Sequence, residues 1–314
     1  MVTFSVIIPT FNRAYLIGDA IESVIKQTFS DWELLVVDDG SCDNTKEVIT
    51  EFICRDARIK YLYKKNGGQN SALNYGLAYA QGIYVAFLDS DDVWLESKLE
   101  RVFEKFQSDE KIDCVYHWTG RMADHGEIPT FECFLEGNIY REVLIQGFMS
   151  SQISLSCKRE QLKKIGNYDE QFKCCQDDAM CFELAKNFKI GLIREVLSLV
   201  GETPGERVTD NSVAKAENYW KLIVKYGGDI INLCGNIEMF HKYTRAMIFY
   251  CRAKMWKRAY EIKKEAEKLV DDRQNILKIN MLYFYEVTKS ITGYTSFALW
   301  RNKRRRMRSR VVHG

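Results

Sequence analysis

The sequence predicts an α/β protein with a mainly parallel sheet, covered by helices on both faces, followed by a helical C-terminal region. Short apolar runs alternate with segments of helical period from residue 4 to about residue 119, and this alternation is typical of right-handed βαβ units. Beyond the turn-rich residues 201–211 the pattern becomes helical. We therefore expect a first domain over residues 1–210, a helical accessory region over 211–300 and a basic tail over 301–314.

Five apolar runs account for the strands predicted in the first part of the chain. They are Phe4 to Ile8, Glu33 to Val37, Ile59 to Tyr63, Tyr84 to Leu88 and Cys114 to Trp118. Between the first two runs, Leu16, Ile17, Ala20, Ile21, Val24 and Ile25 recur at helical spacing, which predicts a helix with one apolar face against the sheet. Asn44, Asn70 and Ser97 are suitable N-terminal caps for the helices that follow.

The remaining elements are predicted from weaker patterns. We expect a strand near Gln152 to Cys157 and a helix from Gln176 to about Phe188. The four helices expected after residue 211 are Tyr219 to Tyr226, Ile237 to Lys254, Trp256 to Val270 and Ile276 to Thr292.

Composition excludes several classes of protein. With 46% hydrophobic and 28% charged residues the chain is not generally disordered. It has no apolar run long enough to span a bilayer and no signal-peptide pattern, so we expect it to be made and kept in the cytosol. Apart from the adjacent pair Cys174-Cys175, the ten cysteines are scattered singly, and no Cys-x-x-Cys occurs, which favours reduced thiols over disulfides or structural zinc.

The charge is unevenly distributed along the chain. Seven basic residues and no acidic ones lie between Arg301 and Arg310, so a formal net charge of +2 overall leaves −5 on the rest. Such a basic arm, preceded by Phe297 and Trp300, is typical of contact with an anionic membrane surface, although charged ends also occur as solubilising tails.

Polar, turn-forming residues follow four of the predicted strands. They are Pro9 to Asn12, Asp38 to Ser41, Lys65 to Gly68 and Asp89 to Asp92. Because ligands bind at the carboxyl ends of the strands in α/β sheets, we expect these residues to share one rim. The first strand is not followed by Gly-x-Gly-x-x-Gly, which argues against a dinucleotide-binding site.

Three carboxylates leave the fourth strand together, at Asp89, Asp91 and Asp92. Like charges this close repel unless a cation offsets them, and Mg²⁺ or Mn²⁺ often binds one or two carboxylates together with substrate phosphates. A solvated acidic turn that caps the next helix is the alternative.

These motifs, in this order, resemble the inverting family 2 glycosyltransferases with the GT-A fold. The resemblance covers roughly residues 3–200 and includes Asn74 downstream of Gly67-Gly68. It implies that Pro9, Thr10, Asn12, Asp39, Asn66, Gly68, Asn74, Asp89 and Ser90 bind a nucleotide-diphosphate sugar. It also implies that Asp91 and Asp89 hold Mg²⁺ or Mn²⁺, and that Asp177, rather than its neighbour Asp178, is the catalytic base. Leu73 stands where an arginine is frequent in the family.

The resemblance implies metal-dependent transfer of a sugar, with inversion, to a hydroxyl of a glycan or lipid-linked acceptor, without nucleic acid as a partner. The sequence offers no recognisable Ser or Cys nucleophile with a paired histidine, which fits a single displacement. Two alternatives stay open on the residues alone. One is a nucleotidyltransferase that makes an activated sugar, and the other is a non-catalytic sugar-binding or scaffold protein.

Overall fold

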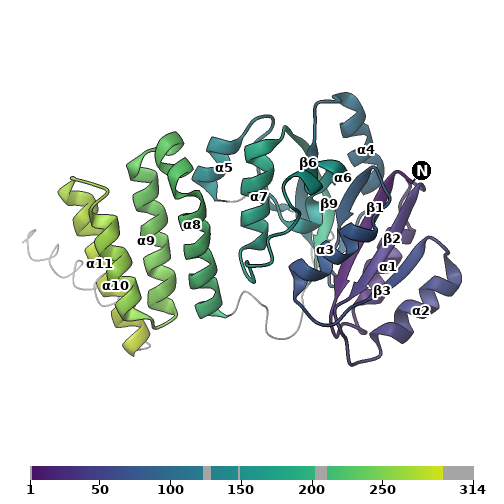
Figure 1. Ribbon diagram of the computed structural model, residues 1–314, viewed down its shortest axis with the longest axis horizontal. Helices are drawn as coiled ribbons and strands as arrows, with labels where there is room; N and C mark the ends of the chain where they lie inside the picture. Colours follow the sequence, from purple (N-terminus) through teal and green to yellow (C-terminus); the bar gives the residue numbers. More distant parts are fainter. Residues whose placement is uncertain (1, 123–128, 148, 202–210, 293–314) are drawn as a thin grey trace, which may run out of the picture. The chain divides into compact units, whose positions relative to one another are not determined.

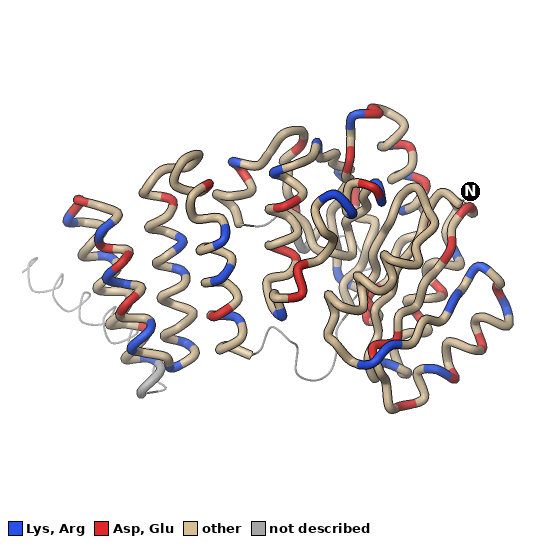
Figure 2. The backbone as a smooth tube through the Cα atoms, viewed as in Figure 1, with Lys and Arg blue, Asp and Glu red and all other residues tan. Residues whose placement is uncertain are grey.

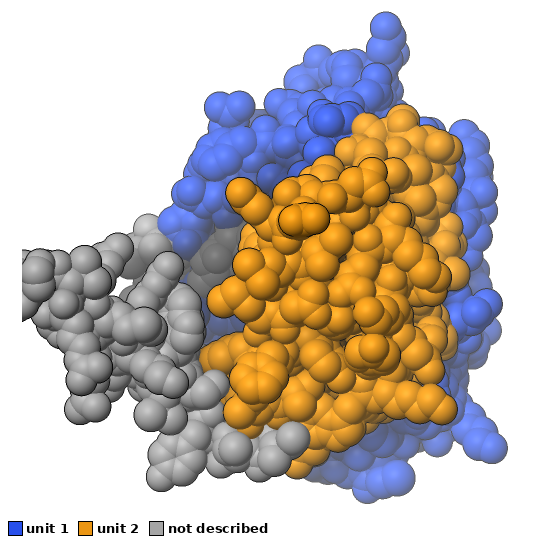
Figure 3. Space-filling view, turned by 90° about the vertical axis from the view of Figure 1, so that its left-hand side faces the viewer, with its two compact units in different colours: residues 1–205 blue, residues 206–314 orange. Residues whose placement is uncertain are grey.

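The computed structural model describes residues 2–122, 129–147, 149–201 and 211–292. The chain divides into two compact units, Met1–Gly205 and Glu206–Gly314 (Figures 1 and 3). The first unit contains the sheet, and the second is helical.

The first unit alternates strands and helices over its N-terminal half. The elements are β1 (Phe4–Thr10), α1 (Ile17–Ile25), β2 (Trp32–Asp38), α2 (Thr45–Arg55), β3 (Ile59–Tyr63), α3 (Gln69–Tyr79), β4 (Tyr84–Phe87), β5 (Val93–Trp94) and α4 (Lys98–Ser108). They are followed by β6 (Cys114–Arg121), β7 (Pro129–Phe131), α5 (Tyr140–Gln146), the short 3₁₀ helix η2 (Gln152–Ser154), β8 (Ser156–Lys158), α6 (Arg159–Lys164), α7 (Gln176–Asn187) and β9 (Ile190–Val200).

The described strands form one mixed sheet in the order β3-β2-β1-β4-β8-β6-β9-β5, with β7 beside β6. β3, β2, β1 and β4 are parallel. β8 then lies antiparallel between β4 and β6, and β9 is parallel to β6. The α/β fold class is therefore confirmed, and the parallel arrangement holds for the four strands with the clearest apolar pattern.

Helices cover both faces of the sheet because successive strand residues point to opposite sides. Phe4, Val6 and Ile8 of β1 belong to a core shared with α1, α2 and α4. Ile7 faces the other side, where Gly76 of α3 lies so close that an added Cβ would overlap the Ile7 side chain. The apolar face expected for α1 is buried through Ile17, Ala20, Ile21 and Val24.

Several elements differ from the sequence prediction, of which β9 and the segment before β8 contribute to the site. β9 was not predicted, although eight of its eleven residues pair in parallel with β6. Its apolar run is interrupted by Arg194 and Glu195, and the β6 ladder shifts register at Trp118, so no simple period marks it. The strand expected near Gln152 to Cys157 is instead the 3₁₀ turn η2 followed by the short strand β8.

The second unit consists of α8 (Ser212–Cys234), α9 (Asn236–Arg252), α10 (Trp256–Glu267) and α11 (Arg273–Thr292). α8 is longer at both ends than the predicted Tyr219 to Tyr226 and is capped by Asn211, whose side chain accepts from the Ala214 N–H at 2.9 Å. Acidic and basic residues are interspersed along α10 (Figure 2). Within the described residues, no helix is both long and apolar enough to span a membrane.

Candidate active site

The carboxyl ends of β1, β2 and β4 meet at one edge of the sheet. β1 pairs with β2 along its whole length but with β4 only from Phe4 to Ile7. Pro9 lies beyond that point and has no N–H to donate to a ladder. The chain places β2 and β3 on one side of β1 and then β4 on its other side. This edge is therefore the topological switch point, where α/β sheets bind ligands.

Asp89 follows β4 and is held by two glutamine amides. Its Oδ1 accepts from Gln69 Nε2 at 3.0 Å and from Gln152 Nε2 at 3.1 Å. Burial raises the pKa of Asp89 well above its usual range, and the negative charges of Asp92, Asp177 and Asp91 raise it further. Excess negative charge of this kind favours a bound cation.

Asp91 and Asp92 form the turn after Asp89. The buried Asp92 accepts at Oδ1 from the Gly201 N–H at 2.8 Å. Gly201 follows β9 and lies so close to Asp91 that a Cβ there would overlap the Asp91 carbonyl oxygen. The end of β9 therefore fixes the acidic turn, and only glycine fits at that position.

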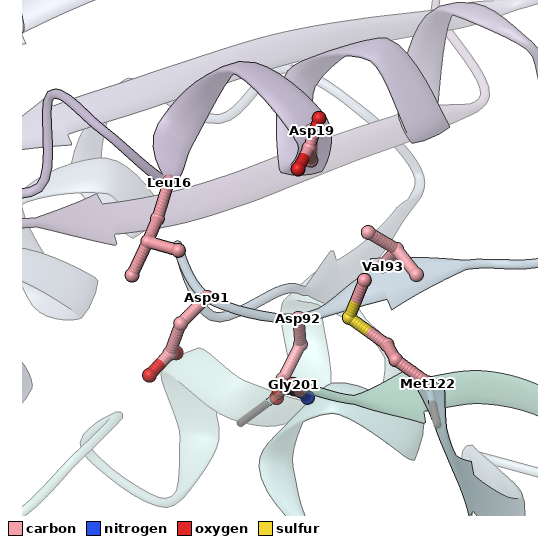
Figure 4. Close-up of a pocket in the computed structure, with 7 residues that line it drawn as sticks. All are labelled: Leu16, Asp19, Asp91, Asp92, Val93, Met122 and Gly201. Atoms are coloured by element: carbon pink, nitrogen blue, oxygen red, sulfur yellow. Dashed lines mark hydrogen bonds between the residues drawn. The ribbon is translucent and has the colours of Figure 1, made fainter. Parts of the chain in front are cut away.

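A pocket of about 300 Å³ opens beside this turn. Figure 4 shows Leu16, which precedes α1, and Asp19 of α1 on one side of it, the turn from Asp91 to Val93 in the middle, and Met122 and Gly201 beyond that turn. Asp19 and Met122 were not predicted as site residues. The sequence near Asp19 and Met122 contains no motif that indicates a site. Asp19, for example, resembles any polar residue in the first turn of a helix.

Asp177 lies in the first turn of α7. Burial raises the pKa of the Asp177 carboxyl to about 6, opposed by a hydrogen bond from the Gln152 backbone N–H. The negative charge of Asp177 is also among the larger influences that raise the pKa of Asp89. The two carboxylates therefore act on each other's surroundings across the site.

Three glutamines connect the acidic turn to the start of α7. Gln176 Nε2 donates to Gln69 Oε1 at 3.0 Å, and Gln69 donates in turn to Asp89. Gln152 contacts both Asp89 and Asp177. Sequence reasoning missed Gln69 and Gln152. Gln69 had a weak signal as the residue after Gly67-Gly68, whereas Gln152 lies in an aperiodic segment and had none.

Asp39, predicted to bind the nucleoside, is buried and hydrogen-bonded to the loop after β3. Its carboxylate accepts from Lys64 Nζ at 2.6 Å, from the Gly67 N–H at 3.0 Å and from the Gly68 N–H at 2.7 Å. An ionised carboxylate has about four acceptor positions, so these bonds occupy most of them. Asp39 therefore shapes the loop that carries Asn66, which is exposed.

Thr10 and Ser90 lie at the ends of β1 and β4, and both are buried. Thr10 Oγ1 has no hydrogen-bond partner among the described residues, while the Thr10 carbonyl accepts from the Asp39 N–H at 2.8 Å. A buried hydroxyl without a partner is costly, so Thr10 Oγ1 is suited to a polar ligand group.

Asn12 and Asn74 hold segments of the site together. Asn12 Oδ1 accepts from the Cys42 N–H at 2.8 Å, which joins the loops after β1 and β2. Asn74 Nδ2 donates to the Tyr168 carbonyl at 2.9 Å, and its Oδ1 accepts from the Tyr168 N–H at 2.9 Å. The Asn74 amide is thereby engaged by the segment that precedes α7.

No group of three or more His, Cys, Asp or Glu side chains in the described ranges is arranged as a metal cage. A magnesium or manganese ion bound partly by substrate phosphates needs only one or two protein carboxylates. Both hydrogen bonds to Asp89 end on Oδ1, so its Oδ2 remains available for a ligand. The oxygen donors and the excess negative charge fit such an ion.

Comparison with known proteins gives a consistent family assignment. The sequence model of glycosyl transferase family 2 matches residues 5–182. Segments of the chain are 48% identical over 97 residues to the Escherichia coli UDP-Glc:alpha-D-GlcNAc-diphosphoundecaprenol beta-1,3-glucosyltransferase WfgD, covering 31% of this chain and 38% of that protein. They are 41% identical over 117 residues to the putative teichuronic acid biosynthesis glycosyltransferase TuaG of Bacillus subtilis, covering 37% and 45%. The matches thus span less than half the length of these relatives.

Two solved structures share the fold. The S. aureus TarS 1-349 structure in complex with UDP-GlcNAc superposes with a TM-score of 0.63 at 18% identity, covering 93% of this chain and 92% of that chain. The mannosyltransferase PcManGT from Pyrobaculum calidifontis, in complex with GDP-Man and Mn²⁺, gives 0.55 at 16% identity, covering 92% and 87%. At these identities the likeness shows the fold alone, which confirms the fold that the sequence resemblance implied.

Proposed function

The chain belongs to glycosyl transferase family 2, and from that premise we propose that it transfers a sugar, with inversion, from a nucleotide-diphosphate sugar to an acceptor hydroxyl. The observation that carries the proposal is that Gln152 lies between Asp89 and Asp177 at the switch point of the sheet, so that the two carboxylates share one site. One carboxylate belongs to the turn suited to a metal and diphosphate, and the other has the properties of a general base.

Asp177 has the role of the base. With a pKa of about 6, its carboxyl is largely ionised at neutral pH yet a stronger base than an ordinary aspartate. It takes the proton of the acceptor hydroxyl as that oxygen attacks the anomeric carbon. One displacement on the face opposite the leaving group gives inversion.

Asp91 and Asp89 would hold Mg²⁺ or Mn²⁺ together with the diphosphate oxygens. When bound, this ion stabilises the charge that grows on the departing nucleoside diphosphate. Thr10, Asp39 and the loop of Gly67 and Gly68 form the nucleoside side of the site. The mannosyltransferase complex with GDP-Man and Mn²⁺, which shares the fold, supports the use of a divalent ion.

A covalent route is not supported by the serine and histidine that approach each other. Ser198 Oγ lies 3.4 Å from His117 Nε2, a pair that the sequence analysis did not predict. Both residues are buried in the core. Burial and the nearby Lys98 lower the pKa of His117 to about 3. The pair is a core contact and no substrate reaches it.

We assign the acceptor to the glycan class, with a lipid-linked sugar as the preferred form. WfgD is named for an acceptor linked to diphosphoundecaprenol and TuaG for teichuronic acid biosynthesis. The chain would meet such an acceptor from the cytoplasmic side of a membrane. The basic tail from Arg301 to Arg310 lies outside the described residues, but α11 before it exposes Leu277 at 62% and Phe284 at 72%. These apolar side chains and the basic tail suit an anionic membrane surface.

Turnover with UDP-glucose, UDP-GlcNAc and GDP-mannose, each with Mn²⁺ and a polyprenyl-diphosphate-linked sugar, tests the proposal. We expect one donor to release its nucleoside diphosphate and to form a glycosidic bond of inverted configuration. Product of retained configuration would refute the single displacement. Consumption or release of pyrophosphate would instead identify a nucleotidyltransferase, and donor binding without turnover would identify a sugar-binding protein.

A further inference from the structure

Gln152 occupies a position between the two carboxylates of the proposed reaction. It belongs to η2, is 3% exposed and comes from a segment far from both carboxylates in the sequence. Its side-chain Nε2 donates to Asp89 Oδ1 at 3.1 Å. Its backbone N–H lies near enough to the Asp177 carboxylate to oppose the rise of the Asp177 pKa. One residue therefore contacts the metal-side carboxylate and the base at the same time.

The orientation of the Gln152 amide depends on Asp89. Its Oε1 is buried without a hydrogen-bond partner among the described residues. If the amide were turned over, this oxygen would face the Asp89 carboxylate and two acceptors would meet without a proton between them. The hydrogen bond to Asp89 thus determines the orientation of the Gln152 amide. It also turns Asp89 Oδ1 toward η2 and leaves Oδ2 for the nucleotide-sugar side of the site.

The backbone of η2 is itself anchored. The carbonyl of Ile153 accepts from Trp94 Nε1 at 3.2 Å and from Ser198 Oγ at 3.0 Å. The Lys98 ammonium lies 3.2 Å from the centroid of the Trp94 ring, with both residues buried. A turn held from behind in this way presents its N–H and side chain to the site at fixed positions.

We propose that Gln152 is a positioning residue for the transfer, which fixes the orientation of Asp89 through its side chain. The inference rests on the proposed function, because it takes its meaning from the role of Asp89 beside the metal and the diphosphate. Without the amide, the Asp89 carboxylate is free to rotate away from the diphosphate. The influence of residue 152 on Asp177 comes from its backbone and is therefore kept whatever side chain stands there.

The test compares Gln152→Met, which keeps the length but removes the donor, with Gln161→Met. Gln161 is a matched control, because its Nε2 donates to Asp113 Oδ1 at 2.7 Å and its Oε1 is also buried without a partner, but it lies on α6 away from the site. A hydrogen bond to a charged group supports an expected loss of about tenfold or more. Gln152→Met should raise the KM of the donor and weaken Mn²⁺ binding in the presence of UDP by that factor, and leave the KM of the acceptor unchanged.

Free Mn²⁺ is measured by electron paramagnetic resonance and folding by thermal unfolding, so one readout is independent of turnover. Gln152→Glu, which keeps the shape but faces Asp89 with a second negative charge, should be worse than Gln152→Met. Gln152→Asn, which keeps the amide but is too short to reach, should resemble Gln152→Met and serves if that variant does not fold. Equal donor KM and Mn²⁺ affinity in the Gln152 variants and Gln161→Met would overturn the inference.

The failure of the inference is distinguishable from that of the proposed function. If the wild-type protein transfers sugar and Asp177→Asn does not, while Gln152→Met matches the control, only the positioning role is wrong. If the wild-type protein transfers no sugar from any of the three donors, the function itself is wrong.

Discussion

Replacing Asp177 with asparagine should remove the catalytic base without removing the fold. The asparagine Oδ1 still accepts from the Gln152 N–H, so the start of α7 keeps its contact with η2. General-base catalysis is typically worth roughly 10² to 10⁴ in rate. Turnover should therefore fall by about that factor, while Mn²⁺-dependent binding of the donor persists because Asp89 and Asp91 are unchanged.

The same substitution should stabilise the protein at high pH. The Asp177 carboxyl has a pKa of about 6 in the fold, against an ordinary value of 3.8. A carboxyl whose pKa is raised by folding destabilises the folded state once it ionises, so the cost is absent below 3.8 and complete above about 6. This difference corresponds to up to about 3 kcal/mol, which Asp177→Asn should recover at pH 8 and not at pH 3.5.

Two measurements check this prediction. Urea unfolding at the two pH values gives the free energy of unfolding, and pre-steady-state turnover between pH 5 and pH 8 gives the chemical step. Wild-type turnover should rise tenfold per pH unit below about 6 and level off above it. Asp178→Asn is the control, since Asp178 is the neighbouring carboxylate in the same first turn of α7. If Asp178→Asn loses turnover and Asp177→Asn does not, the base has been assigned to the wrong residue.

Three further substitutions or deletions test other parts of the site. Asp91→Asn should weaken Mn²⁺-dependent donor binding at least tenfold with little change in unfolding temperature, and chelation of the wild-type protein should have the same effect. If calorimetric titration with UDP and Mn²⁺ gives the same affinity for both proteins, the metal site is contradicted. Gly201→Ala should displace the acidic turn, because its Cβ would overlap the Asp91 carbonyl oxygen, and should lower both donor affinity and unfolding temperature; wild-type values of both would mean that the turn accommodates the methyl group at no cost. Deletion after Trp300 should reduce sedimentation with phosphatidylserine vesicles at low salt by removing seven basic residues; unchanged sedimentation would exclude the tail as the membrane contact.

The sequence alone determined the parallel half of the sheet and the rim of the site. β1 to β4 are short apolar runs bounded by turns, and the pattern of Ile17, Ala20, Ile21 and Val24 is sufficient to identify a helix that covers them. Local patterns succeed here because each strand and helix buries a continuous face. The position of Asp89 to Asp92 after β4 followed directly, since a parallel strand in such a sheet ends at the ligand edge.

Only the tertiary structure decided how the second half of the chain completes that rim. β9, with its interrupted apolar run, pairs with β6 and brings Gly201 against Asp91. Gln152 and Asp177 reach Asp89 from sequence positions 63 residues or more away. Burial raises the pKa of both Asp89 and Asp177, and the charges of Asp92, Asp177 and Asp91 raise that of Asp89 further, which no single segment encodes. Contacts between isolated polar side chains that lie far apart in the sequence leave no periodic pattern. The spacing of the motifs therefore located the site, whereas tertiary packing determined its hydrogen bonds and the pKa shifts of its carboxyls.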